Sequence, residues 1–416
     1  MRIEAHLLQN FAPSCLNRDD TNSPKDAEFG GYRRARISSQ CIKRAVRRYF
    51  DAHPGLVPAE SRARRTKRLL DLACNRLKAN GKSLEAATVA VTTALAGAGL
   101  KVGDDRLTEY LLFLGEAEVD GFVTVVENHW DALSAGSTAA GNGEGAPPAE
   151  PEPVADPAKK TKRRTAKQAK SDARAAVAPE VVKALTGLLD GGKAADLALF
   201  GRMLADRPGA NVDAACQVAH AISTNKVHGM ELDYFTAVDD LKPGDSSGAD
   251  MIGTVEFNSS CFYRYATLDT RLLVDSLQKD RELAEKAARA FLTAFIHAVP
   301  TGKQNTFAAH NPPSLVVLVA RTGAPVSLAN AFVKPVVPRG GEDLVTESAK
   351  ALDRYYGRVV AMYGDGSLKA AALCALDDLD LLSLRKYAVE PAADKTLVDA
   401  AIDRVVGAAF PAGGAA

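Results

Sequence analysis

A dense group of cationic side chains near the start of this sequence could bind several phosphates. No acidic residue lies between Arg33 and Phe50, so these cations have no acidic partner close by along the chain. Hydroxyl and amide side chains accompany them, and such a set offers donors to a phosphate without a carboxylate that could act as a base. The pattern therefore favours a polyanion-binding site. The cations are Arg33, Arg34, Arg36, Lys43, Arg44, Arg47 and Arg48.

Two short elements must position these side chains. The segment from Tyr32 to Ile37 is extended in pattern, and Ser38 or Ser39 can cap a helix that follows it. The N-terminus of such a helix offers unpaired N–H groups and the positive end of its dipole to an anion. The alternative is a merely solvated basic face, although the glycine-containing loop before it favours a site. The apolar positions recur with helical spacing and predict a buried stripe, which consists of Cys41, Ile42, Ala45, Val46, Tyr49 and Phe50.

The composition of the chain limits its class. Its 416 residues are 46% hydrophobic, which suits one elaborate globular domain or two. The net charge is only +1, so the case for a polyanion rests on local clustering. No run of roughly 18 apolar residues occurs, so no transmembrane helix or membrane partner is expected. The first residues lack the form of a signal peptide, and we expect a cytoplasmic protein.

Cysteine and histidine spacing gives no sign of a metal site or a cofactor. The 6 cysteines are scattered without a CxxC pair, which predicts reduced thiols. None of the 7 histidines lies in a metal-ligand pattern. Neither a phosphate-binding GxxxxGK[ST] loop nor a GxSxG nucleophile motif is present. We expect neither a cofactor nor a metal.

Helical patterns dominate the first third of the chain after the basic helix. A first strand from Arg2 to Leu8 precedes the basic region, and residues 17–31 form a polar loop. Amphipathic periodicity then predicts helices at residues 69–77, 84–95, 107–114 and 122–133. This block is interpreted as a helical insertion.

Residues 134–178 differ sharply from the rest in composition. They hold almost no large apolar side chain and cannot build a core, which predicts a disordered insertion. The alternative is a mobile basic arm that neutralises nucleic-acid phosphates without sequence preference. Its candidate residues are Lys159, Lys160, Lys162, Arg163, Arg164, Lys167 and Lys170.

The remaining chain combines strands and helices. Residues 214–227 and 254–266 are predicted strands, and the turn-rich stretch between them predicts a projecting hairpin. Its aromatic residues Tyr234 and Phe235 either fold back onto the body or stack on bases. Helices are expected at residues 179–189, 270–299, 341–362 and 396–406, and a buried strand at 315–320. A loop with Lys303 and Gln304 offers further donors. The order of elements suggests an α+β fold with a ferredoxin-like sheet.

Several segments closely resemble one family. SCLNRDD, SPKDAEFGG and RRARISSQCIKRA are similar to the N-terminal signature of the CasC-type backbone subunit of the type I-E CRISPR complex Cascade, in the RAMP superfamily. HAISTN, DYFTAVDDL, GTVEF, FYRYA, GKQNTFAAHNP and SLANAF extend the likeness to about residue 335. The last eighty residues or so are weakly diagnostic.

The resemblance implies a fold in three parts. Residues 1–55 and 179–416 would form a palm with a modified RNA-recognition-motif fold. Residues 56–178 would form a helical fingers domain, with 134–178 as its disordered insertion. Residues 224–253 would form a β-hairpin thumb within the palm.

The resemblance also implies a function. The chain would be a non-catalytic scaffold that polymerises head-to-tail along a CRISPR guide RNA and leaves the bases free to pair with target DNA. A wedge of Met203, Tyr234, Phe235 and Ile252 would interrupt the stacking of bases, and the basic arm would contact DNA. Large, small, 5′-end-binding and guide-processing subunits and a recruited helicase-nuclease would be partners. The RNA-binding candidates from both arguments are Asn17, Arg18, Lys25, Arg33, Arg34, Arg36, Ser38, Ser39, Gln40, Lys43, Arg44, Arg47, Lys303 and Gln304.

Two other functions stay open. The carboxylate pairs Asp19-Asp20 and Asp239-Asp240 could hold Mg²⁺ for RNA cleavage, as a metal-dependent endoribonuclease on the same fold would require. Adjacent carboxylates are also common as turn or cap residues. A weaker alternative is a general single-strand-binding protein without CRISPR partners.

Overall fold

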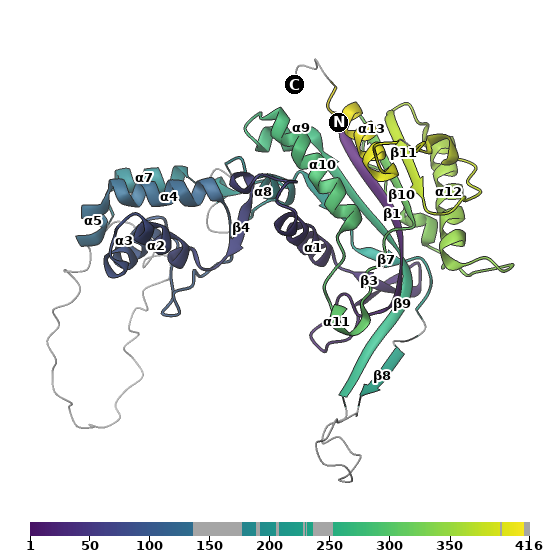
Figure 1. Ribbon diagram of the computed structural model, residues 1–416, viewed down its shortest axis with the longest axis horizontal. Helices are drawn as coiled ribbons and strands as arrows, with labels where there is room; N and C mark the ends of the chain where they lie inside the picture. Colours follow the sequence, from purple (N-terminus) through teal and green to yellow (C-terminus); the bar gives the residue numbers. More distant parts are fainter. Residues whose placement is uncertain are drawn as a thin grey trace, which may run out of the picture. The chain divides into compact units, whose positions relative to one another are not determined.

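The chain folds into two units (Figure 1). The first consists of residues Met1–Pro58 and Asp213–Ala416, and the second of Ala59–Val212. The computed structural model describes residues 1–135, 177–188, 192–204, 208–227, 229, 231–235, 253–391 and 393–411.

An antiparallel sheet forms the centre of the first unit. Within the described residues nine strands take part, in the order β11-β10-β1-β9-β7-β3-β2, with β6 and β8 also paired to β9. The long strands β1 and β9 pair along most of their length, from Arg2 with Asp269 to Ser14 with Asn258. The strands are β1 Arg2–Ser14, β2 Asp26–Phe29, β3 Tyr32–Ile37, β6 Cys216–Val218, β7 Ala221–Ser223, β8 Glu231–Phe235, β9 Gly253–Asp269, β10 Leu315–Arg321 and β11 Leu368–Ala375.

Helices cover this sheet because its strands are apolar on both faces. In β10 the six residues from Leu315 to Ala320 are all buried. Leu315, Val317 and Val319 pack with Leu352 and other residues of α12, so the alternate side chains point to the opposite face. The helices of this unit are α1 Ser39–Ala52, α9 Thr270–Ser276, α10 Arg281–His297, α11 Gln304–Phe307, α12 Leu344–Tyr363 and α13 Leu397–Ala409, with short 3₁₀ turns η4 Ala329–Phe332 and η5 Arg385–Tyr387.

The second unit is mainly helical and has its own core. Small and branched side chains from α2, α3, α4, α5 and α7 pack together, among them Leu77, Ala90 and Val126. A two-stranded sheet of β4 and β5 belongs to the same unit. Its elements are η1 Ala59–Ser61, β4 Ala63–Thr66, α2 Leu69–Ala79, α3 Leu84–Gly97, β5 Leu112–Gly115, α4 Glu116–Asn128, α5 Trp130–Ser134, α7 Pro179–Gly187, α8 Ala195–Phe200 and η3 Pro208–Ala210.

Three elements differ from the predictions made from periodicity. The expected helix at 107–114 is a loop followed by β5, whose four buried residues pair with β4. The expected strand at 214–227 is two short strands that pair with different parts of β9. The expected helix at 270–299 is α9 and α10, because Gln278 and Lys279 adopt left-handed conformations before the cap of α10.

Helix α7 lies in the second unit rather than with the sheet. We expected residues from 179 onward to return to the unit that contains the N-terminus. Val181, Val182 and Leu185 instead pack into the helical core of residues 59–212. The amphipathic pattern of a helix shows that one face is buried but not which core buries it.

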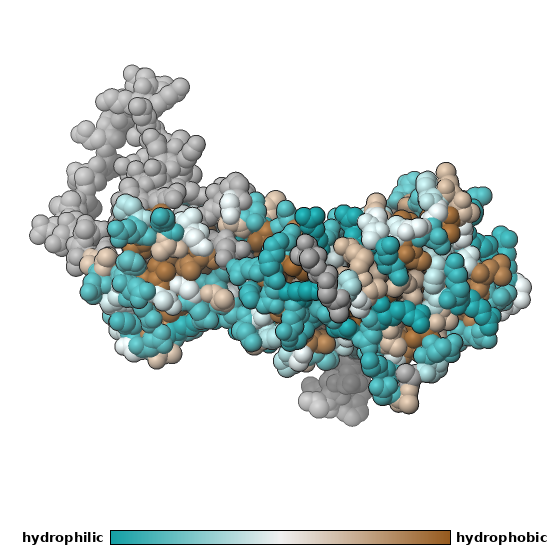
Figure 2. Space-filling view, turned by 90° about the horizontal axis from the view of Figure 1, so that it is seen from above, coloured by the Kyte–Doolittle hydropathy of each residue, from teal (hydrophilic) through white to brown (hydrophobic). Residues whose placement is uncertain are grey.

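The α+β expectation is confirmed by this mixture of helices and antiparallel strands. On the face seen in Figure 2, hydrophobic residues form small separate patches among hydrophilic ones. Among the described residues, no helix has the combined length and apolar character that crossing a lipid bilayer requires.

Candidate nucleic-acid interface

The loop that follows β1 is held in shape by Asp19. The carboxylate oxygen Oδ1 of Asp19 accepts hydrogen bonds from the backbone N–H and hydroxyl of Thr21 and from the N–H of Ser23, at 2.8 to 3.0 Å. The hydrogen bond from the Thr21 hydroxyl is the main reason that the pKa of Asp19 lies below its usual value. The loop is closed at its base, where the N–H of Lys25 donates to the carbonyl of Asn17. Its polar side chains are therefore presented by an ordered turn.

Helix α1 begins where the sequence predicts. Ser38 is the N-cap, and its hydroxyl accepts a hydrogen bond from the N–H of Cys41. The N–H of Ser38 donates in turn to the side-chain oxygen of Asn17 at 2.8 Å, which joins the loop to the start of the helix. The first turn of α1 contains no acidic side chain. Its positive dipole end therefore lies beside the loop without a counter-charge on the first turn of the helix itself.

A cleft of about 370 Å³ opens between this loop, α1 and the segment before α11. We call it the first cleft. Four cationic side chains line it among the described residues, and one carboxylate, that of Asp19. The cations come from three separate stretches of the chain and are Arg18, Arg44, Arg48 and Lys303. Asn17, Asn22 and Thr301 also line the cleft.

Gly302 allows the wall of the first cleft to approach the loop. A Cβ atom at this position would lie 2.3 Å from the carbonyl oxygen of Leu16 and 2.7 Å from that of Cys15. Both atoms belong to the backbone and cannot rotate away. The substitution Gly302→Ala must therefore move the segment that carries Lys303.

We expect Gly302→Ala to destabilise the protein by about 1–3 kcal/mol through this overpacking. It should also weaken the binding of anionic ligands in the first cleft, because Lys303 moves with the wall. Gly55→Ala is the matched control, since a Cβ there meets nothing within 4 Å. Urea denaturation of the two variants measures the difference in their free energies of unfolding. Equal values would show that the backbone accommodates the added Cβ at residue 302 without loss of stability.

A second cleft of about 490 Å³ lies on the other side of the same loop, between β2, β3 and the β8–β9 pair. Lys25, Arg33 and Arg36 line it. Arg33 forms an ion pair with Asp26 on the neighbouring strand. Arg36 donates to the carbonyl of Asp26 and bonds to His220 Nδ1 at 2.9 Å. Partial burial is the largest cause that lowers the pKa of His220, and the charges of Arg36 and Lys25 lower it further. A lower pH is therefore needed to protonate this imidazole than an ordinary histidine.

The two clefts differ in charge. Among the described lining residues of the second cleft, the three cations face three carboxylates, of Asp19, Asp26 and Glu256. The first cleft has a clear cationic excess. A phosphate gains more from the first, because repulsion by carboxylates offsets attraction in the second. The sequence showed no acidic partner near these cations along the chain, but the β2–β3 pairing brings Asp26 to the same face as Arg33 and gives this one arginine a carboxylate.

Arg34 was predicted to bind RNA, but the structure places it in the interior. Its side chain is fully buried, and its guanidinium donates to backbone carbonyls of residues 223, 224, 225, 332 and 333. Burial lowers the pKa of this arginine. The side chain fastens β3 to two distant loops and has no free face for a phosphate. Arg34 is therefore a structural residue.

Other predicted residues lie around the first cleft without lining it. Ser39 and Gln40 are in the first turn of α1, and their side chains interact with each other. Lys43 and Arg47 are half-buried, and each has a partner within the chain. Gln304 donates to the carbonyls of residues 300 and 309, so it shapes the segment that carries Lys303.

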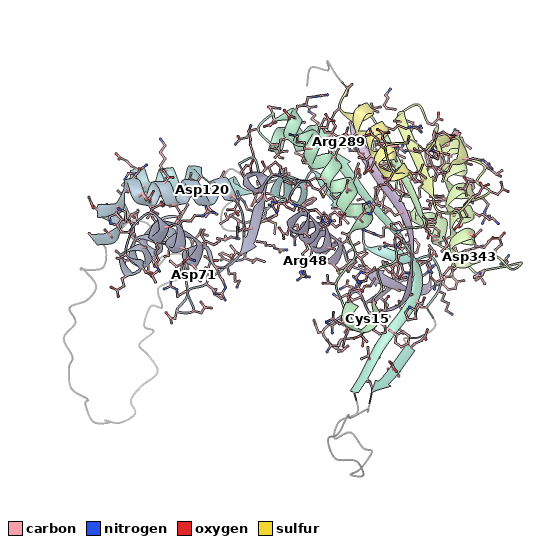
Figure 3. All side chains as sticks on the ribbon, in the orientation of Figure 1. Cys15, Arg48, Asp71, Asp120, Arg289 and Asp343 are labelled. Atoms are coloured by element: carbon pink, nitrogen blue, oxygen red, sulfur yellow. The ribbon has the colours of Figure 1, made fainter. Side chains whose placement is uncertain are left out.

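Arg48 belongs to the basic group from which the sequence predicted a polyanion site, but it is absent from the RNA-binding candidates. Its exposed side chain extends from α1, as Figure 3 shows. It is one of the residues that line the first cleft. The resemblance points to Lys43, Arg44 and Arg47, but not to Arg48. The sequence could have placed Arg48 beside Arg44 in the site, because the two are four residues apart and residues i and i+4 share a helix face.

The structure describes only some of the residues that were predicted to form the wedge between bases. Met203 lies in the second unit and is 83% exposed. The residues before and after it are anchored: Arg202 forms a buried ion pair with Glu118, and the N–H of Leu204 donates to Asn211. Tyr234 and Phe235 end strand β8, opposite Thr254 and Gly253. Ile252 lies outside the described residues, as do the seven lysines and arginines of the predicted DNA-contacting arm.

Comparison with known proteins identifies the family. The family described as CT1975-like protein matches residues 3–400. No curated protein matches the sequence. A chain from a solved CRISPR RNA-guided surveillance complex, pre-nicking, is 28% identical, with a TM-score of 0.79, and the match covers 99% of this chain and 100% of that chain.

A second solved structure supports the fold alone. It is a chain of a CRISPR RNA-guided surveillance complex, 23% identical, with a TM-score of 0.69 over 98% of this chain and 100% of that chain.

The family match spans almost the entire sequence and agrees with the resemblance in the N-terminal motifs. This chain belongs to the CT1975-like family, and its resemblance to a CasC-type Cascade subunit is confirmed.

Proposed function

We propose that this chain is the guide-RNA-binding scaffold subunit of a Cascade-type surveillance complex of type I-E. It grips the sugar–phosphate backbone without regard to sequence and leaves the bases free to pair with target DNA. The observation that carries the proposal is the first cleft, where four cations and one carboxylate surround a space of about 370 Å³. A site of this charge, with amide and hydroxyl groups but no base-sized apolar platform among its lining residues, recognises phosphate rather than base edges.

The proposal assigns a role to each part of the chain. The sheet unit serves as an RNA-recognition-motif-like palm, the helical unit as fingers, and the β8–β9 hairpin as a thumb. The wedge of Met203, Tyr234, Phe235 and Ile252 separates bases at intervals. Copies associate head-to-tail along one guide, with other Cascade subunits at the ends and a helicase-nuclease recruited to the complex. Residues 159–170 contact target DNA through their cations.

The chain acts without cutting RNA in this proposal. The alternative is an endoribonuclease that uses Asp19 and Asp20 to hold Mg²⁺. Asp19 already accepts three hydrogen bonds from its own turn through one carboxylate oxygen. Across the described part of the chain, no three histidine, cysteine, aspartate or glutamate side chains gather in a cluster that could hold a metal ion. These observations favour a turn-forming role for Asp19.

One experiment separates these functions. The chain is co-expressed with a repeat-containing guide precursor and the neighbouring subunits, and the copurifying RNA is sized and sequenced. We expect a large particle with one discrete RNA and several copies of the chain. A monomer with heterogeneous RNA would instead favour a general single-strand-binding protein.

A cleavage assay addresses the enzyme alternative directly. Labelled single-stranded RNA is incubated with the purified chain in Mg²⁺ and in a chelator. We expect intact RNA in both. Fragments that require Mg²⁺ and disappear with Asp19→Ala would establish the nuclease and overturn the non-catalytic assignment.

A further inference from the structure

Three aromatic side chains form a column on the surface of the first unit, where the ends of two helices meet. Tyr49 lies in the last turn of α1, His53 caps the C-terminus of that helix, and His297 is the last residue of α10. We call this group the aromatic column. We propose that a base of single-stranded RNA stacks on the aromatic column while a neighbouring phosphate lies in the first cleft. The inference rests on the proposed scaffold function and specifies how the site holds a base as well as the backbone.

The rings of Tyr49 and His53 are stacked on each other. Their centroids lie 3.9 Å apart, and their planes differ by 19°. The two residues are one helical turn apart, so both side chains project from the same side of α1. A hydrogen bond fixes the arrangement, because His53 Nδ1 donates to the carbonyl oxygen of Tyr49 at 2.9 Å. The imidazole is therefore held against the tyrosine ring.

His297 extends the aromatic column from a second helix. The centroid of its ring lies 6.4 Å from that of Tyr49, with only 16° between the two planes. This separation is near the upper limit for interacting ring pairs. His297 and His53 are both exposed, whereas Tyr49 is half-buried. The column therefore presents flat ring surface that is accessible to a base.

The aromatic column continues both walls of the first cleft. On α1, Ala45 and Arg48 line the cleft, and Tyr49 follows Arg48 directly and lies one turn beyond Ala45. On the other wall Pro300 lines the cleft, and His297 precedes it by three residues. The rings of Tyr49 and His297 are neighbours, so the two walls converge at the column. The column therefore lies at one end of the cleft.

The opposite end of the first cleft is closed by the loop after β1. A Cβ on Gly302 would lie 2.3 Å from the carbonyl oxygen of Leu16, and the thiol of Cys41 donates to the same oxygen at 3.9 Å. Cys41 and Tyr49 are separated along α1 by about 12 Å, at the usual rise of an α-helix. Arg48 lies at the end near the column, so a phosphate that it binds brings the adjoining base close to the rings.

Aromatic rings beside cations are a common means of holding a single strand. The rings contact the face of a base and accept any base, because every base has a π-face. The cations contact phosphates, which carry no sequence information. Stacking leaves the hydrogen-bonding edge of the base unused, so the base remains able to pair with a target strand. The aromatic column therefore fits a scaffold that binds RNA of any sequence and presents its bases.

The charges near the aromatic column favour an anionic strand. Arg48 is exposed and is the residue next to Tyr49. The nearest carboxylate along α1 is that of Asp51, which follows Tyr49 by two residues and therefore lies on a different face of the helix. Asp51 also has a partner within the chain. A phosphate beside the column is thus attracted by a cation without facing a carboxylate on the same side of α1.

Two substitutions of His297 separate ring stacking from other effects. His297→Phe keeps a flat ring, whereas His297→Leu supplies an apolar side chain without one, and both remove the imidazole nitrogens. The affinity of the full chain for a short oligoadenylate is measured by fluorescence anisotropy. We expect the leucine variant to bind about 5- to 50-fold more weakly than the phenylalanine variant, which is the effect of losing one stacked base. The phenylalanine variant should bind nearly as well as the unaltered chain.

A strand without bases provides a second test that needs no variant. An abasic ribose-phosphate strand of the same length keeps the phosphates and removes stacking. The unaltered chain should prefer oligoadenylate to this strand, whereas His297→Leu should lose most of that preference. The slope of log K against log salt should be the same for the leucine and phenylalanine variants, because they make the same phosphate contacts.

Tyr363→Leu is the matched control. This tyrosine is 76% exposed at the end of α12 and lies outside both clefts, so its loss should leave RNA binding unchanged. Equal affinities of His297→Leu and His297→Phe, or equal binding of the two strands by the unaltered chain, would overturn the inference while the scaffold function stands. The rings would then only pack α1 against α10. Failure of the unaltered chain to bind either strand would contradict the scaffold function and this inference together.

Discussion

Replacing both Arg44 and Arg48 by alanine is expected to weaken the binding of single-stranded RNA by about 10- to 100-fold at moderate salt. Both side chains line the first cleft from one face of α1. Each releases counterions from the RNA when it meets a phosphate, so the slope of log K against log salt should fall by about 0.7 for each lost contact. Filter binding or fluorescence anisotropy at several salt concentrations measures both quantities.

The matched control for this change is Arg354→Ala with Arg358→Ala. These arginines are exposed on α12 at the same spacing of four but lie outside both clefts. Their loss should leave affinity and salt slope nearly unchanged. An equal effect of the two pairs would mean that the chain binds RNA through general charge rather than in the first cleft.

The same measurement decides between neighbouring cations of α1. The resemblance implies RNA contacts by Lys43 and Arg47, but the structure half-buries both and gives each a partner within the chain. Lys43→Ala with Arg47→Ala should therefore affect RNA binding less than the Arg44 and Arg48 pair does. The reverse order would show that the RNA lies on the other side of α1.

Arg34→Ala is expected to destabilise the protein by about 3–5 kcal/mol, the usual cost of removing one partner from a buried charged network. The guanidinium supplies hydrogen bonds to five backbone carbonyls, from residues 223–225 and 332–333. No carboxylate is among these acceptors, so alanine leaves a group of buried carbonyls without donors. The melting temperature should fall by roughly 5–15 °C.

Arg33→Ala is the control in the adjacent position. Arg33 forms an exposed ion pair with Asp26, with 54% of its side chain accessible, so its loss should cost at most about 1 kcal/mol. Calorimetry of the two variants side by side is the measurement. A similar loss of stability at both positions would contradict the structural role assigned to Arg34 alone.

Local patterns in the sequence predicted most individual elements. Of the two predicted N-caps of α1, Ser38 is the one observed. Four of the six predicted stripe positions, Ile42, Ala45, Val46 and Phe50, are buried, whereas Cys41 and Tyr49 are half-buried. The apolar run at 315–320 is confirmed as part of β10. These features depend on hydrogen bonds and side-chain periodicity within a few residues, which the sequence displays directly. The helix predicted at 107–114 is wrong, because the short apolar run of β5 has a composition that fits a buried strand as well as a buried helix.

Family membership and the cationic character of the N-terminal region were determined by the sequence alone, because both depend on contiguous motifs and residue types. Only the tertiary structure decided which of these cations are exposed in the first cleft, where they could meet an anion. Arg33 and Arg34 are neighbours in the chain, yet strand pairing gives Arg33 a carboxylate at the surface, while Arg34 is buried under loops nearly two hundred and three hundred residues away. Lys303 joins Arg18, Arg44 and Arg48 for the same reason. Burial and long-range pairing depend on which distant segments fold together, and residue spacing carries no record of that.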